Sequence, residues 1–171
     1  HDRVVGRLTH HELGDPISDA QIPELEVALM SSELFKTAKV TFERTAEGVV
    51  IVAVLVDKMS WISAPTIYLL PASWSAGVGF AENNLLGEDK KLLLYGQIGN
   101  RTNLFFGTYF DPSVNGTKLQ RRFDLYTYRR YLQEYLDPPG DARSFEIGRE
   151  TQQTFLDAGA LVGWKFYWWL V

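Results

Sequence analysis

The sequence predicts an α+β module over residues 1–58, followed by antiparallel up-and-down strands of a partial β-barrel over residues 59–171. Apolar residues recur at helical spacing in the first part, whereas this period disappears from Trp61 onward. Runs of roughly ten residues then follow one another, separated by polar turns. No crossover helix fits between these runs, so neighbouring strands are expected to be antiparallel.

The composition excludes several classes of protein. Apolar residues make up 46% and charged residues 22% of the 171 residues, which indicates a folded chain rather than a disordered one. The net charge of -4 provides no basic surface for nucleic acid. Because cysteine is absent, disulfides and thiolate metal sites are excluded, and the redox compartment stays open.

Any crossing of a membrane depends on strands rather than helices. No apolar run approaches the roughly 20 residues of a transmembrane helix, and the best run is Val49–Val56. No signal-peptide core follows His1, so a secreted protein would be present here in mature or truncated form. The strands of a transmembrane β-barrel alternate in polarity and escape hydropathy windows, so this architecture is compatible with the sequence.

The first unit is expected to contain a strand, a helix and a hairpin. Residues 4–8 form a short strand candidate, and Ser18–Gln21 has the Ser-x-x-Gln form of a capping box. Because Pro23 lacks an N–H, the first helical turn is expected to begin near Ile22. The apolar stripe of this helix, which we expect to face a sheet, comprises Ile22, Leu25, Leu29 and Met30.

Two strands follow that helix. Ala38–Arg44 alternates, with Val40 and Phe42 directed inward. Val49–Val56 is almost entirely Val, Ile and Ala, which is typical of a central strand covered on its helix side. A unit of this length is marginal for independent stability.

The second unit is expected to consist of about seven strands. Their expected ranges are Trp61–Leu70, Trp74–Phe80, Lys91–Gly99, Asn103–Phe110, Leu119–Leu132, 145–153 and 154–171. The last of these has one apolar face, which comprises Leu156, Ala158, Ala160, Val162 and Trp164. One apolar and one mixed face fits both a soluble barrel and a membrane barrel.

Aromatic and arginine residues refine this prediction. Trp61, Tyr68 and Trp74 flank the first turn, and five aromatic residues crowd positions 164–169. Such clusters suit the headgroup girdles of a membrane barrel, and equally the core of a sandwich. Because charge facing lipid is costly, Arg121-Arg122 and Arg129-Arg130 are expected near strand ends or toward the lumen, and we favour a solvated hairpin beyond the bilayer.

We expect no catalytic residue, no metal site and no cofactor. His10 and His11 are adjacent, so their side chains point apart on an extended segment. The Gly77-Val78-Gly79 segment lacks the Lys and the helix of a phosphate loop, and no nucleophile elbow occurs. The nearest carboxylate cluster, which we interpret as lumen or loop charges, comprises Glu146, Glu150 and Asp157.

Two stretches resemble the BamA/TamA-like outer-membrane β-barrel assembly family (POTRA plus barrel, bacterial surface antigen). Gly14–Asp19, a helix, Glu33–Val40 and the ending Val49–Asp57 resemble a POTRA module. Gly77–Gly87 resembles a glycine-rich turn early in the family's barrel, and Phe110–Ser113 fills the place of its following D-P motif. Two departures are Glu88-Asp89, where a second Gly is usual, and Pro23 in the helix.

The resemblance implies an α+β POTRA module followed by antiparallel up-and-down transmembrane β-barrel strands. It implies a protein of the bacterial outer membrane, with its N-terminal module in the periplasm, that inserts or translocates polypeptides without a nucleotide or other cofactor. The implied partners are outer-membrane lipid and unfolded β-barrel or secreted clients, with periplasmic lipoproteins or further copies of the chain as additional partners, and no nucleic acid.

The resemblance also assigns candidate sites. The client edge of the POTRA module comprises Ala38, Lys39, Val40, Thr41 and Phe42. The lateral-gate strand comprises Trp61, Ile62, Ala64, Thr66 and Tyr68. The family turn comprises Gly77, Gly79, Asn83, Asn84 and Gly87, and the lipid-facing set is the apolar face that runs from Leu156 to Trp164. Pro65 and Pro71 fit either an imperfectly paired edge or a bend at the junction of the two units.

Alternatives remain open at this point. Within the family, the chain fits a two-partner-secretion or passenger-display transporter as well as an assembly factor. Outside it, a soluble β-barrel that binds lipophilic ligands is an alternative. The family's barrel has about sixteen strands, and an open half-barrel cannot sit in lipid, so we expect a truncated barrel or one that several copies close. The family's V-R-G-F-type loop motif is absent.

Overall fold

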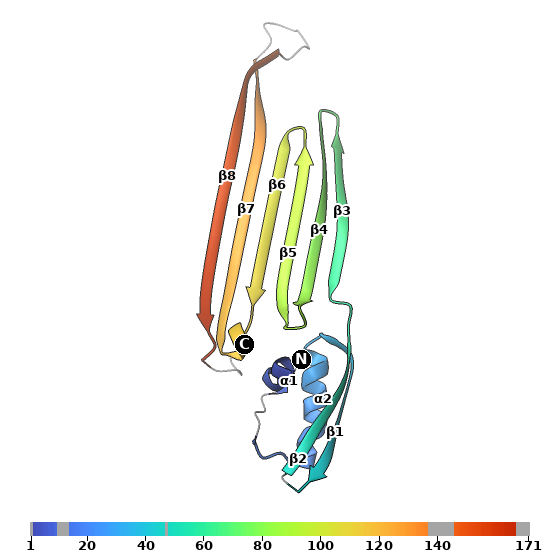
Figure 1. The fold of residues 1–171 in the computed structure, drawn as a ribbon. Helices are drawn as coiled ribbons and strands as arrows, with labels where there is room; N and C mark the ends of the chain where they lie inside the picture. Colours follow the sequence, from blue (N-terminus) through green and yellow to red (C-terminus); the bar gives the residue numbers. More distant parts are fainter. Residues whose placement is uncertain (1, 10–13, 47, 137–145, 167–171) are drawn as a thin grey trace.

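The computed structural model describes residues 2–9, 14–46, 48–136 and 146–166, arranged as a small α+β unit beneath a large sheet (Figure 1). The small unit contains α1 (Asp2–Thr9), α2 (Ile22–Ser31), β1 (Phe35–Thr45) and β2 (Gly48–Asp57), with the 3-10 turn η1 (Asp19–Gln21) before α2. The large sheet contains β3 (Trp61–Leu70), β4 (Ser73–Leu85), β5 (Lys90–Gly99), β6 (Thr102–Asp111), β7 (Leu119–Leu136) and β8 (Glu146–Trp164). A second 3-10 turn, η2 (Val114–Gly116), connects β6 and β7. None of the described helices is both long and apolar enough to cross a membrane.

The first element is a helix, so the prediction of a strand over residues 4–8 was wrong. Val4, Val5 and Leu8 lie on one helical face and pack into the core of the small unit. Tertiary packing thereby overrides the β propensity of two adjacent valines. The order of the small unit is therefore helix, helix, hairpin rather than strand, helix, hairpin.

The start of α2 agrees with the prediction from sequence. The Ser18 backbone N–H donates to Gln21 Oε1 at 2.8 Å, which is one half of a capping box. The helix begins at Ile22 with Pro23 in its first turn, where the missing N–H costs nothing. The buried stripe is narrower than expected, because Leu25 and Leu29 are buried whereas Met30 is 43% exposed.

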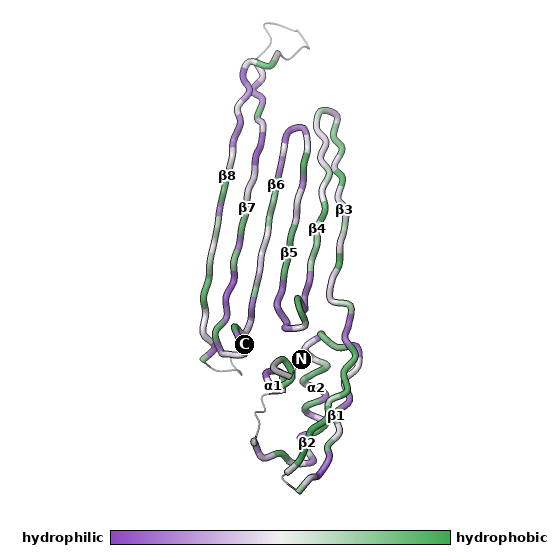
Figure 2. The backbone as a smooth tube through the Cα atoms, viewed as in Figure 1, coloured by the Kyte–Doolittle hydropathy of each residue, from purple (hydrophilic) through white to green (hydrophobic). Residues whose placement is uncertain are grey.

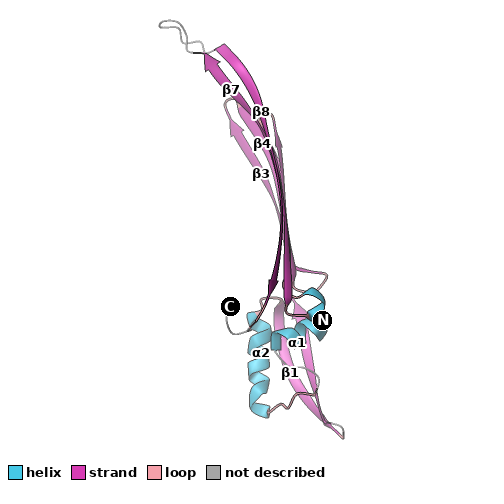
Figure 3. Ribbon diagram, turned by 90° about the vertical axis from the view of Figure 1, so that its left-hand side faces the viewer, coloured by secondary structure: helices cyan, strands magenta, loops and turns pink. Residues whose placement is uncertain are grey.

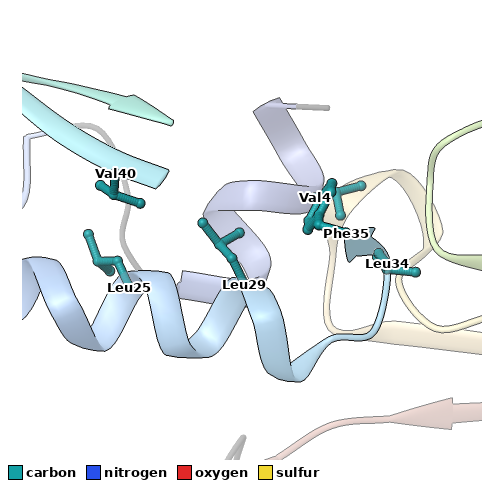
Figure 4. Packing of buried hydrophobic residues seen from close by; sticks show 6 residues of the cluster. All are labelled: Val4, Leu25, Leu29, Leu34, Phe35 and Val40. Carbon is teal, nitrogen blue, oxygen red and sulfur yellow. The ribbon is translucent and has the colours of Figure 1, made fainter. Parts of the chain in front are cut away.

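The core of the small unit lies between the two helices and β1. Its buried apolar residues are Val4, Leu25, Leu29, Leu34, Phe35 and Val40 (Figure 4). β1 and β2 pair antiparallel, with Val40 opposite Ala53. β2 was predicted to be a central strand, but among the described strands it pairs only with β1. Four valines on the face of β2 that does not carry Ala53 are also substantially exposed, namely Val50, Val52, Val54 and Val56.

The large sheet has the predicted up-and-down order. Its six described strands pair consecutively from β3 to β8, all antiparallel, and β3 and β8 form its two edges. Over the described residues the sheet is open rather than closed into a barrel. Figure 3 shows it almost edge-on, with neither described helix packed against its faces.

Two predicted strands at the C-terminal end are one. Residues 145–153 and 154–171 were expected to be separate, but β8 is continuous over Glu146–Trp164. The polar run Arg149–Thr154 stays in the ladder because residues of β7 pair with it, including Glu134 with Arg149. Long-range pairing thus decides a boundary that local polarity had suggested.

The β7–β8 hairpin extends beyond the rest of the sheet (Figure 1). β6 begins at Thr102, opposite Arg130, so β7 residues beyond Tyr131 pair only with β8. Figure 2 shows mainly hydrophilic residues along this projecting part. Arg121 and Arg122 lie near the start of β7, as expected for charges kept near strand ends. Arg129 and Arg130 lie in the middle of β7, at the level where β6 begins and the projection starts.

Candidate functional site

The pairing register assigns every residue of the large sheet to one of two faces, because directly paired residues share a face. One face, here the apolar face, carries the set Leu156–Trp164 that the sequence predicted to be lipid-facing. It contains two complete rows across all six strands without a charged side chain. The first row is Pro65, Val78, Gly96, Phe105, Thr127 and Leu156. The second row is Ser63, Phe80, Leu94, Gly107, Leu125 and Ala158.

Nothing in the described residues covers the apolar face. Leu156 is 73% exposed and Val162 is 69% exposed, and no described apolar side chain of the large sheet belongs to the buried core. The charged side chains of this face lie outside these two rows. Arg121, for example, pairs with Asp111 at 3.2 Å, and the side chain of Asp111 is 2% exposed. The face therefore presents a broad uncharged apolar surface with its ion pair at one margin.

The opposite face, here the polar face, carries hydrogen-bonded networks. Thr66 Oγ1 and Tyr95 Oη lie 2.9 Å apart, and Tyr95 Oη donates to Gln97 Oε1 at 2.7 Å. Gln97 Nε2 in turn donates to Ser75 Oγ at 2.7 Å. The chain of contacts joins the edge strand β3 to β5 across β4.

Gly77 makes room for this network. A Cβ atom at Gly77 would lie 2.6 Å from the Gly96 carbonyl oxygen and 2.9 Å from Thr66 Oγ1, closer than real Cβ contacts allow. The neighbouring Gly79 lies beneath Tyr95, with 3.6 Å from an ideal Cβ to Tyr95 Cδ2. Two of the glycines assigned to a family turn thus lie inside β4 and allow close packing on the polar face.

A second network occupies the polar face further along the sheet. Thr108 Oγ1 donates to Asp124 Oδ1 at 2.5 Å, and Arg122 Nε donates to the same oxygen at 2.9 Å. Thr108 lies in the interior of β6, and Asp124 lies opposite it in β7. Asp124 on the polar face lies level with the uncharged rows of the apolar face, and such a difference between two faces is typical of a barrel wall between a wet lumen and lipid.

The turn after β4 begins later in the sequence than the predicted family turn does. Gly77, Gly79, Asn83 and Asn84 all lie in β4, which continues to Leu85, so of this set only Gly87 is in the turn. Leu86 and Asp89 also adopt positive φ there, at 60° and 56°. Asn84 still supports the turn, because its Oδ1 accepts the Asp89 N–H at 2.8 Å.

Alternate residues of β3 direct their backbone N–H and C=O groups either to β4 or to the free edge of the sheet. Which residues bond to β4 is here called the phase of the ladder. Antiparallel ladders alternate, and the Asn83 N–H donates to the Ser60 carbonyl oxygen at 2.9 Å. With Trp61 opposite Glu82, this contact sets even-numbered residues of β3 to bond with β4. The backbone groups that face the free edge belong to Trp61, Ser63, Pro65, Ile67 and Leu69.

This phase divides the predicted lateral-gate residues into two sets. Ile62, Ala64, Thr66 and Tyr68 direct their backbone groups to β4, so of the predicted set only Trp61 presents its backbone at the free edge. Pro65 lies in mid-strand opposite Val78, not at a bend between the two units, and Pro71 lies in the β3–β4 loop. The length of that loop is a signal that could have indicated the phase from the sequence, since loop length sets the ladder of a hairpin.

The predicted client edge on β1 is partly occupied. The Val40 N–H donates to Glu26 Oε1 at 2.7 Å, so Val40 faces the free edge and its donor is satisfied by α2. By alternation, Ala38 and Phe42 also face that edge, whereas Lys39 and Thr41 direct their backbone groups to β2. Sequence reasoning missed Glu26, because no local pattern links it to Val40.

An ion pair joins the small unit to the large sheet. Arg7 Nη2 of α1 lies 2.5 Å from Asp89 Oδ2, in the turn between β4 and β5, and both side chains are about four-fifths buried. Burial raises the pKa of the Asp89 carboxyl, although Arg7 opposes this shift. The pair therefore ties α1 to the strand ends at a desolvated contact.

No group of three or more potential metal-ligating side chains occurs among the described residues. His10, His11 and the terminal aromatic cluster beyond Phe166 lie outside the residues that the structure describes. The candidate functional features of the described residues are the free edges of β1 and β3 and the apolar and polar faces of the large sheet.

Comparison with known proteins supports the architecture alone. No protein-family model matches the sequence, and no curated protein matches it. The fold is similar to the crystal structure of BamA from Haemophilus ducreyi lacking POTRA domains 1-3, with a TM-score of 0.52, 11% identity and 96% of this chain covered. The chain spans 42% of the length of that BamA chain. The described residues therefore have a BamA-like fold, in the form of an open sheet that corresponds to part of a barrel.

Proposed function

We propose that this chain belongs to an outer-membrane protein that inserts β-barrel precursors or translocates polypeptides, in the manner of BamA. Its large sheet is then part of a transmembrane barrel wall, and its small unit is a POTRA-type module in the periplasm. The observation that carries the proposal is the pair of uncharged apolar rows across six strands, opposite a face with polar networks. The BamA-like fold supports the same assignment.

The physical role of the sheet follows from the solvent around it. Hydrocarbon offers no hydrogen bonds, so every backbone group of a spanning sheet needs a protein partner. An open sheet has two unsatisfied edges, which among the described strands are β3 and β8. Further strands, from the same polypeptide or from other copies, are needed to close the barrel.

The proposed activity requires no cofactor. An unfolded client has unpaired strand backbone, and an exposed edge can satisfy it by strand addition. β3 provides such an edge at its odd-numbered residues. The client strand then exchanges its hydrogen bonds to β3 for hydrogen bonds to its own neighbouring strands, and so enters the membrane with its backbone groups satisfied.

Adjacent residues of β8 test the membrane assignment. Spin labels at Leu156→Cys and Asp157→Cys would lie on opposite faces of one strand. We expect the label at position 156 to collide mainly with oxygen, which concentrates in hydrocarbon, and the label at 157 mainly with a water-soluble nickel complex. Equal exposure of both labels to the nickel complex would refute the lipid-facing assignment.

Client identity separates assembly from the other transport roles. Crosslinking from Ser63→Cys, at the free edge of β3, should trap unfolded outer-membrane barrel precursors if the protein is an assembly factor. Trapping of a secreted passenger alone would favour two-partner secretion or passenger display. A stable monomer obtained without detergent, with the apolar face packed inward, would instead favour the soluble lipophilic-binding module.

A further inference from the structure

We propose that Pro65 limits how tightly any strand can pair with the free edge of β3, and so keeps that pairing reversible. This inference rests on the proposed function, in which a client strand docks there. Pro65 lies in mid-strand opposite Val78, and its nitrogen is directed away from β4. A proline nitrogen carries no hydrogen, so the row of donors along the edge is broken at its centre.

The break divides the edge into two short ladders. Trp61 and Ser63 provide donors on the side of the small unit, and Ile67 and Leu69 provide them on the side of the β3–β4 loop. A partner strand that spans both parts places one carbonyl opposite Pro65 without a donor. Pro65 belongs to an uncharged row of the apolar face, where no water replaces the missing bond.

Proline also lowers the cost of the state in which no partner strand is paired with the free edge of β3. When a partner strand leaves, each remaining N–H at the edge loses its acceptor, and in hydrocarbon such an orphan donor is costly. At position 65 no orphan donor is created. Pro65 therefore weakens the paired state and spares the unpaired state, and both effects accelerate release.

The inner side of β3 has the opposite character. Thr66 hydrogen bonds to Tyr95, which continues to Gln97 and Ser75, and Gly77 permits this close approach. Thr66 is the least exposed part of β3, the rest of which is exposed. The strand is thus held firmly on the β4 side while its outer partner is held weakly.

The occupant that fits this edge is a transmembrane β-strand of a client. The odd-numbered residues of β3 that face the edge have side chains on the apolar face, among them Ile67 and Leu69, which are 70% and 77% exposed. A strand that continues the sheet must carry apolar residues on that same face and polar or small residues on the other. This alternation is the pattern of membrane β-strands.

The test measures the lifetime of the docked client in the full-length protein. A urea-unfolded outer-membrane barrel precursor with a single strand cysteine is the probe, and Ser63→Cys reports docking by disulfide trapping. After excess competitor is added, trapping at successive times gives the dissociation rate. Pro65→Val and Pro65→Ala each restore the donor, and Pro71→Ala is the control, because Pro71 lies in the loop rather than in the ladder.

We expect the client lifetime to increase about tenfold in both Pro65 variants, from one restored hydrogen bond in a dry setting, and to stay unchanged in Pro71→Ala. Heat-modifiable migration of each variant checks that the barrel has folded. Trapping with equal lifetimes in all variants would overturn the role of Pro65 and leave the proposed function intact. Absence of trapped client in every variant, including the one with native Pro65, would overturn the docking of barrel precursors at β3 and, with it, the proposed insertion of such precursors.

Discussion

The free edges of β1 and β3 each lack one available backbone N–H donor, but for different reasons. On β1, the N–H of Val40 is present and is satisfied by the Glu26 carboxylate, which a competing acceptor can displace. On β3, the donor at Pro65 is missing altogether. The β1 edge belongs to the small unit, where water can satisfy an opened donor; the β3 edge lies beside the apolar face. A polar edge can therefore be capped by a side chain, whereas an edge in hydrocarbon, as the proposed function implies for β3, is better relieved by removing the donor.

The largest loss of stability is expected from a substitution that weakens the packing of β3 against its own sheet. Gly77→Val places a branched side chain where a single Cβ already lies 2.6 Å from the Gly96 carbonyl oxygen. We expect the free energy of unfolding to fall by about 1–3 kcal/mol, because overpacking displaces the side chains of Thr66 and Gln97. Urea unfolding in detergent measures this, and Gly96→Ala, which meets nothing within 4 Å, serves as the control.

Opening the β1 edge tests its side-chain cap. Glu26→Ala removes the acceptor of the Val40 N–H, and we expect a loss of about 1 kcal/mol of stability together with faster hydrogen exchange at Val40. Glu26→Gln keeps an acceptor oxygen and should lose less. If exchange at Val40 were as slow in Glu26→Ala as in the native chain, Glu26 would not be what protects this edge.

The ion pair between the two units gives a pH dependence. Because burial raises the pKa of Asp89 above its ordinary value of 3.8, ionisation is less favourable in the folded state. Stability from this group is therefore greatest below the unfolded pKa and falls as the pH rises through the folded pKa. We expect Arg7→Met to make this fall steeper, since Arg7 is the main group that lowers the pKa of Asp89.

Unfolding at a series of pH values measures this effect. Asp89→Asn removes the titrating group. In the Asp89→Asn background, the pH profiles with and without the Arg7→Met substitution should therefore coincide. Identical pH profiles for Arg7→Met and the native chain, with Asp89 retained in both, would contradict the desolvated contact.

The smallest expected effect concerns the polar network behind β3. Tyr95→Phe removes the hydroxyl that links Thr66 to Gln97, and we expect a loss of about 0.5 kcal/mol, the low end for a hydrogen bond, because these contacts are only partly buried. Tyr126→Phe, on the same face in β7, is the matched control for loss of a tyrosine hydroxyl. A larger loss in the control than in Tyr95→Phe would show that the network does not hold β3 in place.

Several elements could be predicted because their signals are local. The bounds of β3 match the prediction at both ends, and β5 and β6 match within one residue, because alternation and turn chemistry mark both ends of these strands. The start of α2 near Ile22 followed from Pro23 and the capping box. The apolar set Leu156–Trp164 followed from the period of two along an extended strand.

The errors involve contacts distant in sequence. A strand was predicted where Val4 and Leu8 instead pack as a helix against α2, and β8 was divided where its polar run is held by β7. The sequence did not indicate which residues of β3 face its free edge, because a side-chain pattern does not report which backbone groups face outward. The cap on Val40 comes from a residue 14 positions earlier.

The up-and-down strands and the apolar set on the last strand could be read from the sequence, since each depends on the spacing of nearby residues. The ladder phase of β3, the capping of β1 and the continuity of β8 required the folded chain. These features depend on which strands pair and in which register, and pairing is set by packing across the whole sheet.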